Sequence, residues 1–319
     1  MTAHALNTFE GEVCITEKKL VAEDTFLFRF VPVGNGTFPQ WAPGSHVEIR
    51  LGEGLIRQYS LCSRSTDRFW EIAVLRSEAG RGGSVQLCDT LGIGDKVEIF
   101  GTRNHFGFED SPRYLFLAGG IGITPILPMI EAAEEAGRSW ELHYGARCNE
   151  ALAFEDRLSQ YGDRVTLYPE DRTGRIPLGE LTAGLDPATL VYSCGPGPML
   201  NAVEAAMAHL PESMLRIERF AAVEAPQPVG GDQPFKVELA LSGETIEVAA
   251  NESMLDALRK AGTKVDFSCM EGTCGACEVS VLRGKIDHRD AVLTKAEQRA
   301  GELVMPCVSR ATGTLTLEL

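Results

Sequence analysis

Four cysteines near the C-terminal end have a spacing that supports iron–sulfur chemistry. Cys269, Cys274 and Cys277 form a Cys-x4-Cys-x2-Cys run, and Cys307 follows further along the chain. This spacing is typical of the four thiolate ligands of a [2Fe–2S] cluster. Glycines and an alanine within the run let backbone N–H groups approach the cluster sulfurs closely. The sequence therefore predicts a carrier of single electrons.

A zinc site and a disulfide pair are the alternatives for these cysteines. Zinc sites usually combine two closely spaced cysteine pairs, or one pair with histidines, whereas Cys307 stands alone. The chain has 9 cysteines, and an odd number in 319 residues does not indicate a secreted disulfide framework.

Composition limits the classes of function. A length of 319 residues predicts two or three domains. The net charge of −15 and the lack of basic stripes argue against nucleic acid as a partner. The sequence contains no long uncharged apolar run, and its first residues lack signal-peptide features, so we expect a cytoplasmic protein without membrane association.

The elements between residues 12 and 101 are short runs of alternating apolar and polar residues. Gly, Pro and Asn clusters separate these runs, and one short helix over Ser84–Leu91 interrupts them. This pattern predicts a small antiparallel β-barrel.

Two segments of the predicted barrel carry groups that could bind a ligand. Arg57, Tyr59 and Ser60 lie on one strand, with Arg57 and Tyr59 on the same face. The turn Arg81–Ser84 opens the short helix and offers backbone N–H groups to a phosphate. An ordinary strand and a plain glycine turn remain the alternatives.

Strands and helices alternate after Pro112, which predicts a five-stranded parallel sheet covered on both faces. Gly119–Pro125 follows the first strand, and Cys194–Met199 follows the fourth. Open parallel sheets bind ligands at the carboxyl ends of their strands, so both loops are candidate ligand sites. For Cys194, a buried thiol with a packing role is the alternative.

The C-terminal segment predicts a β-grasp fold that carries the cysteines. Ala221–Pro234 is a Pro/Gly linker, and either Ser253 or Asn251 caps the helix that follows the first hairpin. Predicted strands cover 235–241, 245–248, 277–282 and 315–319. We expect the run Asp287–Asp290, including His288, to form a surface loop rather than a metal site.

Taken together, these motifs resemble the ferredoxin reductase superfamily. The Arg-x-Tyr-Ser strand resembles its flavin barrel, and the G-R-G-G-S loop with Thr102–Phe106 resembles the phthalate dioxygenase reductase family more narrowly, which implies FMN. The resemblance implies flavin contacts from Arg57, Gln58, Tyr59, Ser60, Ala73, Val74, Leu75, Arg81, Gly82, Gly83 and Ser84.

The same resemblance implies a nicotinamide site. Its A-G-G-x-G-x-T-P and C-G-P-x-x-M loops match this chain, so Thr124 and Cys194 are expected beside the nicotinamide ring, and Phe220 is expected over the flavin. Phe220 as a core residue is the alternative. The implied nucleotide contacts come from Gly120, Gly122, Thr124, Arg147, Asp171, Cys194, Gly195, Pro196, Met199 and Phe220.

The choice between NADH and NADPH depends on charge beyond the second and third strands. Arg147 follows the second strand and could bind a 2′-phosphate, but Glu150 lies close by and Glu170 and Asp171 follow the third strand. This balance favours NADH, with Arg147 pairing to a neighbouring acid as an open alternative.

The expected fold is therefore a multidomain β and α/β chain. It has an FMN-binding barrel at 7–108, an NAD(H)-binding domain at 109–226 and a plant-type [2Fe–2S] ferredoxin domain at 233–319. The resemblance implies a monomeric, NADH-dependent reductase that passes electrons through FMN and the cluster to a Rieske-type terminal oxygenase.

Other functions stay open at this point. The terminal component could belong to a vanillate, phenoxybenzoate or terephthalate system, or to a carnitine monooxygenase. A flavin reductase, a redox sensor and a zinc-stabilised binding module are the remaining alternatives.

Overall fold

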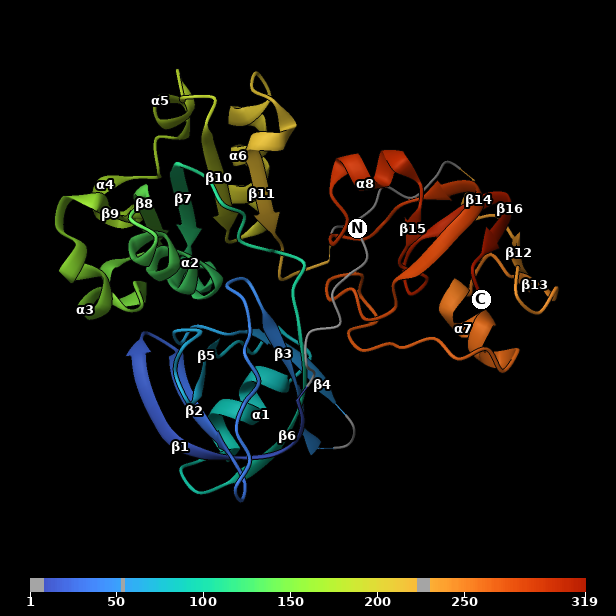
Figure 1. Ribbon diagram of the computed structural model, residues 1–319, viewed down its shortest axis with the longest axis horizontal. Helices are drawn as coiled ribbons and strands as arrows, with labels where there is room; N and C mark the ends of the chain where they lie inside the picture. Colours follow the sequence, from blue (N-terminus) through green and yellow to red (C-terminus); the bar gives the residue numbers. More distant parts are fainter. Residues whose placement is uncertain (1–8, 53–54, 223–229) are drawn as a thin grey trace. The chain divides into compact units, whose positions relative to one another are not determined.

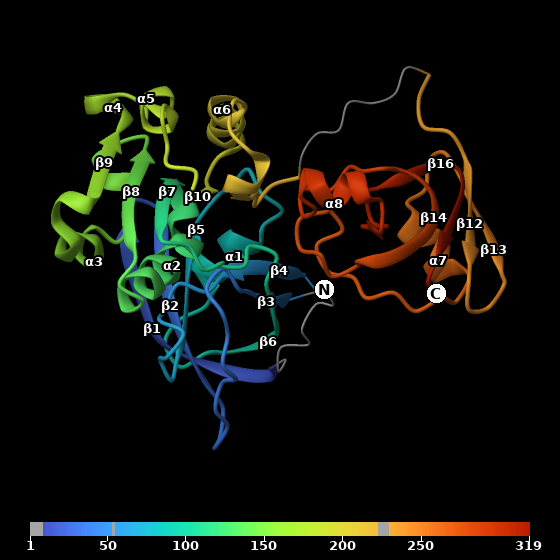
Figure 2. The ribbon, with the colours of Figure 1, turned by 45° about the horizontal axis from the view of Figure 1, so that its top comes forward.

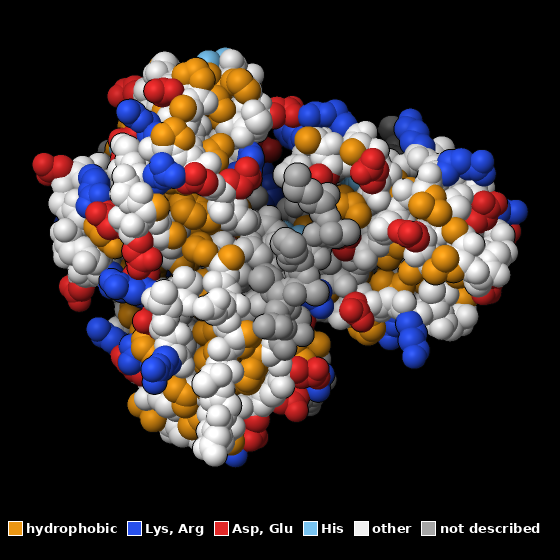
Figure 3. Space-filling view, viewed as in Figure 1, with side chains coloured by type: hydrophobic (Ala, Val, Ile, Leu, Met, Phe, Trp, Pro, Cys, Tyr) orange, Lys and Arg blue, Asp and Glu red, His pale blue; other side chains and the backbone are white. Residues whose placement is uncertain are grey.

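The computed structural model describes residues 9–52, 55–222 and 230–319, and these form two compact units. The N-terminal unit ends at Glu218, and the C-terminal unit begins at Arg219. Figure 1 shows two sheets in the first unit and one in the second. On the face seen in Figure 3, acidic and basic side chains are interspersed, with no stripe of Lys and Arg.

The first sheet of the N-terminal unit is an antiparallel barrel. Its strand order is β4-β3-β6-β1-β2-β5, and a bridge between Leu61 and Ile72 joins its two edges. Trp70, Phe28 and Phe30 are fully buried inside it. The strands are β1 Glu10–Ala22, β2 Thr25–Pro32, β3 His46–Arg50, β4 Ile56–Ser60, β5 Trp70–Leu75 and β6 Lys96–Arg103.

The short helix expected in the barrel is present as α1, Gly83–Thr90. Gly82 precedes it with φ of 79°, a conformation that only glycine adopts without strain. Leu87 and Cys88 are buried in the barrel core, and they fix the helix against it.

The second sheet is parallel, with the order β11-β10-β7-β8-β9. Alternate residues of β7 face opposite helical layers: Phe116 packs in one core with Ile126 of α2, and Leu117 packs in another with Val203 of α6. Helices therefore cover both faces, as expected (Figure 2).

The elements of this sheet follow one another in an alternating βα order. The strands are β7 Arg113–Gly119, β8 Ser139–Ala146, β9 Val165–Pro169, β10 Thr189–Cys194 and β11 Leu215–Glu218, and the helices are α2 Ile123–Glu135, α3 Glu155–Leu158, α4 Glu170–Thr173, α5 Leu178–Thr182 and α6 Gly197–Met207. Short 3-10 helices cover Gly120–Gly122, Asn149–Ala151, Ser159–Arg164 and Glu212–Met214.

The two sheets of the N-terminal unit share one apolar core. Leu27, Cys62 and Ala73 of the barrel pack with Phe116 and Ile126 from β7 and α2. This shared core explains why the barrel and the parallel sheet form a single compact unit rather than two.

Charged side chains line the rim of this shared core. Arg157 binds Glu71 of β5 (Nη1–Oε2 3.4 Å) and Glu131 of α2 (Nη2–Oε1 3.1 Å). Arg29 also binds Glu71 at 2.7 Å, and Arg64 lies 3.6 Å from Glu131. We call these five residues the interdomain ion cluster; they lie beside a cavity of about 680 Å³.

The C-terminal unit contains a mixed sheet of order β13-β12-β16-β14-β15, in which β12 and β16 are parallel. Ser253 caps α7 by accepting the N–H of Asp256 at 3.0 Å, which settles the choice between Ser253 and Asn251. The elements are β12 Phe235–Leu239, β13 Thr245–Val248, α7 Met254–Lys260, β14 Val279–Asp287, α8 Lys295–Ala300, β15 Leu303–Val304 and β16 Arg310–Leu317.

The segments around residues 220, 288 and 221–234 differ from the predicted arrangement or lie partly outside the described residues. The strand β11 ends at Glu218, so Phe220 lies beyond it rather than at its end. The predicted surface position of His288 is wrong for its side chain, which is only 10% exposed and lies 3.5 Å from the buried carboxylate of Asp290. Residues 223–229, half of the linker Ala221–Pro234, lie outside the described residues.

Candidate functional site

The four cluster cysteines come together in the C-terminal unit. Cys269, Cys274, Cys277 and Cys307 are all buried, although Cys307 lies on a separate turn that precedes β16. Cys269 interacts with the thiols of Cys274 and Cys307, and Cys277 also interacts with Cys307. The fold therefore brings together the four sulfur atoms that the cysteine spacing predicts as cluster ligands.

The backbone of the cysteine loop provides hydrogen bonds to sulfur. The N–H groups of Glu271 and Thr273 donate to the Sγ of Cys269 at 3.3 and 3.4 Å. Met270 and Gly272 have positive φ values of 59° and 69°, which turn successive N–H groups towards the sulfurs. This donor arrangement fits the sulfur-rich surface of a [2Fe–2S] cluster.

Close packing behind Gly272 fixes the position of the loop. A Cβ at this residue would lie 2.5 Å from Val308 and 3.1 Å from the Cα of Asp290. The carboxylate of Asp290 in turn accepts the N–H of Leu293 at 2.9 Å, and Ala291 donates to the carbonyl of Gly272 at 2.8 Å. The segment after β14 thus supports the cysteine loop from behind.

The thiol pKa values follow from the mutual contacts of the sulfurs. Hydrogen bonds from Cys274 and Cys307 lower the pKa of Cys269, and the same bonds raise the pKa values of their two donors. A group of thiols that already shares hydrogen bonds in this way fits ligands that must lose their protons when iron binds.

The two candidate flavin segments meet at the start of α1. The side chain of Arg57 on β4 packs against Gly83, where a Cβ would lie 2.6 Å from its Cγ. Arg57 also donates to the carbonyl of Arg81 at 3.0 Å. The predicted phosphate turn and the predicted flavin strand therefore form one site, with Ser84 held by the backbone of Ser77.

Tyr59 and Ser60 complete this strand. Burial raises the pKa of the Tyr59 phenol, which keeps it protonated as a donor. The Ser60 hydroxyl is buried and has no hydrogen-bond partner among the described residues. Such a buried polar group needs a partner, so it fits a polar edge of a flavin ring.

The remaining predicted flavin contacts lie on β4 and β5. Gln58 is half-buried and pairs with Glu48 of β3. Ala73 belongs to the shared core and Val74 to the barrel core, whereas Leu75 is 41% exposed. The side chain of Val74 therefore faces the barrel interior, which leaves only its backbone for a ligand.

The two nucleotide loops pack directly on each other. A Cβ at Gly122 would lie 2.3 Å from the carbonyl oxygen of Cys194. A Cβ at Gly119 would lie 2.5 Å from the Sδ of Met199 and 2.8 Å from Pro196. These glycines are thus required for close approach, and they place both loops at the carboxyl ends of β7 and β10, where the strand order reverses.

The groups expected beside the nicotinamide are buried at this junction. Thr124 donates to the carbonyl of Ile121 at 2.9 Å, which leaves its oxygen lone pairs as acceptors. Gly120 has φ of 52°, and its carbonyl accepts the Tyr144 hydroxyl. Burial raises the pKa of Cys194 well above its ordinary value, so the thiol is neutral.

Glu218 is a site residue that the sequence analysis missed. It pairs in register with Cys194 across β10 and β11, and its Oε2 lies 3.9 Å from the Cys194 sulfur. Desolvation raises the pKa of its carboxyl to about 8. A carboxyl held partly protonated at neutral pH beside a ligand loop is a functional candidate. Its place at the end of a short strand is the only sequence signal for it.

Arg147 and Asp171 meet at the carboxyl ends of β8 and β9. Asp171 donates its backbone N–H to the carbonyl of Arg147 at 3.3 Å. The guanidinium of Arg147 binds Glu23 of the barrel at 2.8 Å and approaches Asp24 at 4.0 Å. Arg147 therefore pairs with an acid, but one that is distant in sequence.

Phe220 is 44% exposed and belongs to the C-terminal unit. The alternative interpretation of Phe220 as a core residue is therefore wrong. Its role over a flavin remains a prediction.

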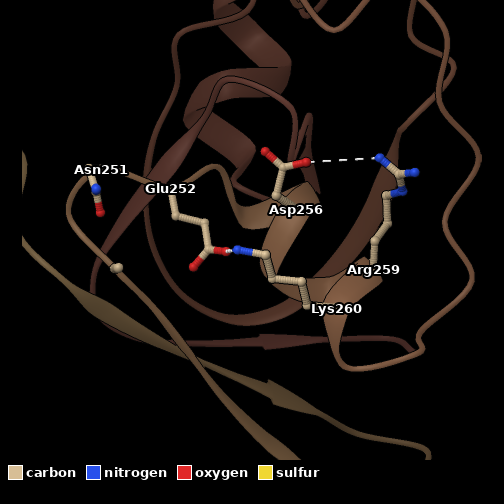
Figure 4. Close-up of a pocket in the computed structure, with 6 residues that line it drawn as sticks. Asn251, Glu252, Asp256, Arg259 and Lys260 are labelled. Carbon is tan, nitrogen blue, oxygen red and sulfur yellow. Dashed lines mark hydrogen bonds and ion pairs between the residues drawn. The ribbon is translucent and has the colours of Figure 1, made fainter.

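A separate pocket beside α7 contains none of the predicted ligands. Figure 4 shows Glu252 pointing towards Lys260 and Asp256 towards Arg259, from which it is separated by 3.9 Å. These groups neutralise one another at the surface.

Within the described part of the chain, no helix is long and apolar enough to span a bilayer.

Two segments of the chain, the predicted nucleotide domain and the cysteine-bearing unit, match known protein families. Residues 116–205 match the family described as the oxidoreductase NAD-binding domain, and residues 237–312 match the 2Fe-2S iron-sulfur cluster binding domain. Phenoxybenzoate dioxygenase subunit beta of Ectopseudomonas oleovorans is 41% identical over 303 residues, which cover 93% of this chain and 94% of that protein.

Solved structures also resemble this chain over almost its whole length. An intact type IV self-sufficient cytochrome P450 monooxygenase matches with a TM-score of 0.91 and 40% identity, covering 97% of this chain but only 41% of that one. Phthalate dioxygenase reductase, titled as a modular structure for electron transfer from pyridine nucleotides to [2Fe-2S], matches with a TM-score of 0.70 and 34% identity over 97% and 98% of the two chains. This chain belongs to the phthalate dioxygenase reductase family, and it is an oxidoreductase that uses NADH, FMN and a [2Fe–2S] cluster.

Proposed function

We propose that this chain is the reductase component of a phthalate dioxygenase-type aromatic oxygenase system, in which it reduces a separate Rieske-type terminal oxygenase. One observation carries the proposal: a single chain combines the flavin strand, the paired nucleotide loops and four converging thiols. FMN accepts electrons in pairs and releases them one at a time, which suits a two-electron donor and a one-electron cluster.

The residues of the chain have positioning roles in this proposal. Arg57 and the turn at Arg81–Ser84 hold the FMN phosphate, because together they supply a guanidinium and backbone N–H donors. Ser60 donates to the flavin ring, since its buried hydroxyl has no protein partner among the described residues. Tyr59, on the same strand, packs beside the ring.

The nicotinamide half of the site has its own set of residues. The loops at Gly120–Gly122 and Gly195–Met199 cradle the pyrophosphate and the nicotinamide. Thr124 accepts a hydrogen bond from the carboxamide, and Glu218 orients the Cys194 thiol by accepting its hydrogen bond.

We further propose that the protein acts in the cytoplasm as a monomer that meets its oxygenase transiently. All nine cysteines are free of disulfide bonds, which agrees with a reducing compartment. The oxygenase would accept electrons from the cluster at Cys269, Cys274, Cys277 and Cys307.

An anaerobic titration of the reconstituted protein tests the reductase function. NADH should bleach both the flavin and the cluster absorption, and the reduced protein should then reduce a purified phthalate-type or phenoxybenzoate-type oxygenase at a catalytically competent rate. A protein that retains no FMN through gel filtration, or a cluster that stays oxidised under NADH, would contradict the proposal. If the reduced protein reduces cytochrome c but not the oxygenase, it is a general electron donor rather than the reductase of that oxygenase system.

A haem acceptor is the second candidate, because the self-sufficient P450 contains a region that is 40% identical to this chain. The same reduced protein, mixed with a separate P450 under carbon monoxide, distinguishes the two acceptors. Faster formation of the ferrous–CO complex than of reduced oxygenase would favour the haem acceptor.

A further inference from the structure

The turn between β1 and β2 reaches from the barrel to the nucleotide sheet. The N–H of Glu23 donates to the carbonyl of Glu150 at 2.7 Å, so backbone contact fixes the turn in place. The adjacent Asp24 has φ of 55°, a left-handed conformation that Asp tolerates better than most residues. The two carboxylates are therefore held at the end of β8.

The target of these carboxylates is Arg147. Its Nη2 lies 2.8 Å from the Oε2 of Glu23 and 4.0 Å from the Oδ2 of Asp24. The hydrogen bond with Glu23 also raises the pKa of Arg147. The thiol of Cys148 lies 3.7 Å from the same Glu23 oxygen. The positive charge of Arg147 is therefore neutralised by the acidic side chains of the barrel turn.

The proposed nucleotide site places the adenosine ribose of the dinucleotide at this position. In open parallel sheets the residues beyond the second strand contact the ribose, and an Arg there accommodates a 2′-phosphate. Asp171, at the end of β9, is tied to Arg147 through its backbone. A ribose at this edge therefore meets one neutralised cation and several carboxylates.

We propose that Glu23 and Asp24, supplied by the flavin barrel, exclude NADPH by occupying Arg147. The inference rests on the proposed nucleotide site and adds the residues that set its specificity. A 2′-phosphate carries negative charge, so it would have to displace Glu23 from Arg147 and would then lie beside two carboxylates. NADH has only hydroxyl groups at this position and meets no such penalty.

Two further cations lie near this edge. Arg175 is 3.6 Å from Glu170. The pKa of the Glu150 carboxyl is lowered chiefly by its own backbone N–H and by Cys148, and to a smaller degree by the charge of Arg172. Both follow Asp171 on or after α4, and each has an acidic neighbour on the nucleotide sheet itself. Arg147 differs from them because its partner comes from the barrel, so the barrel turn can be altered without changing the nucleotide sheet.

The experiment compares kcat/KM for NADH and NADPH in the FMN-loaded, cluster-containing protein. The double variant Glu23→Gln, Asp24→Asn keeps the shape of the turn and removes both charges. We expect NADPH to improve about tenfold relative to NADH, because each exposed charge contributes modestly to a nearby phosphate. The gain should shrink as salt concentration rises.

Two controls make the result specific. Glu12→Gln removes one carboxylate from β1, the strand that precedes the turn. Glu12 pairs with Lys96 at 3.0 Å, and its removal should leave the cofactor ratio unchanged. Adding Arg147→Gln to the double variant should abolish the gain in NADPH use.

Three outcomes would overturn the inference. These are an unchanged ratio in the double variant, an equal gain in Glu12→Gln, or a gain that survives Arg147→Gln and so belongs to Arg172 or Arg175. A wild-type protein that oxidises neither nucleotide would instead refute the proposed function, so the two failures are distinguishable.

Discussion

Removing Arg157 should destabilise the N-terminal unit by separating its two halves. Arg157 is the member of the interdomain ion cluster that binds both Glu71 of the barrel and Glu131 of α2. The side chains of these acids are only 6% and 12% exposed, and that of Arg157 is 31% exposed. The variant Arg157→Met keeps much of the aliphatic packing but leaves both carboxylates with fewer partners.

The magnitude follows from what remains of the cluster. Removing one partner of a buried ion pair typically costs about 3–5 kcal/mol, because the other charge stays buried. Here Arg29 still binds Glu71 at 2.7 Å, and Arg64 lies 3.6 Å from Glu131. We therefore expect a loss of about 2–3 kcal/mol in the free energy of unfolding. For a unit of this size that lowers Tm by roughly 4–12 °C.

Thermal unfolding of the FMN-loaded protein, followed by circular dichroism, measures the loss. Lys96→Met is the matched control, because it breaks the exposed pair with Glu12 and should change stability by less than about 0.5 kcal/mol. Adding Glu131→Gln to Arg157→Met should recover part of the stability, since burial already raises the pKa of Glu131.

The reasoning is refuted if Arg157→Met unfolds within 0.5 kcal/mol of the wild type, on the scale of an exposed pair. It is also refuted if the Glu131→Gln addition lowers Tm further, because Glu131 would then be stabilised by groups other than Arg157.

Three other predictions concern the cofactor sites. Gly122→Ala should raise the KM for NADH about tenfold or more, because a Cβ 2.3 Å from the Cys194 carbonyl forces the two loops apart. Gly179→Ala, which has open space around it and lies outside both loops, should leave this KM unchanged, and equal effects of the two variants would disprove the close-packing argument. Gly83→Ala should weaken FMN binding about tenfold in fluorescence titrations, because the added Cβ displaces Arg57. Gly179→Ala should not change FMN affinity. An unchanged FMN affinity in Gly83→Ala would show that Arg57 does not bind FMN. Glu218 has a folded-state pKa of about 8, above its ordinary value, so its protonated form favours folding at low pH and stability should fall as pH rises from about 4.5 to about 8. Glu218→Gln should flatten that part of the Tm–pH profile, and a profile identical to the wild type would show that the carboxyl titrates normally.

Local motifs made most of this site predictable from the sequence. The cysteine spacing, the glycine turns and the Arg-x-Tyr-Ser strand each lie within a few residues, and the backbone geometry of a short segment depends mainly on that segment. The helix α8 also carries a local signal, the capping box between Thr294 and Glu297, which the sequence analysis did not use.

Contacts between distant segments were not predictable in the same way. Glu218 meets Cys194 only because β10 and β11 pair in one particular register, and the strand patterns do not specify that register. Pairing of Arg147 with a neighbouring acid was an open alternative, but its partner Glu23 comes from a turn 124 residues away. His288 lies in a loop after β14, as predicted, but its side chain is only 10% exposed and lies beside the buried carboxylate of Asp290.

The separation of the apolar cores has a consequence for oxidative damage to this enzyme. The barrel and the parallel sheet share one core, whereas the thiol-bearing unit has cores of its own. Oxidative loss of iron would therefore injure the exit of the electron path and spare its entrance. A protein that has lost its cluster would continue to oxidise NADH without reducing its acceptor protein. It would reduce dioxygen to superoxide and peroxide instead.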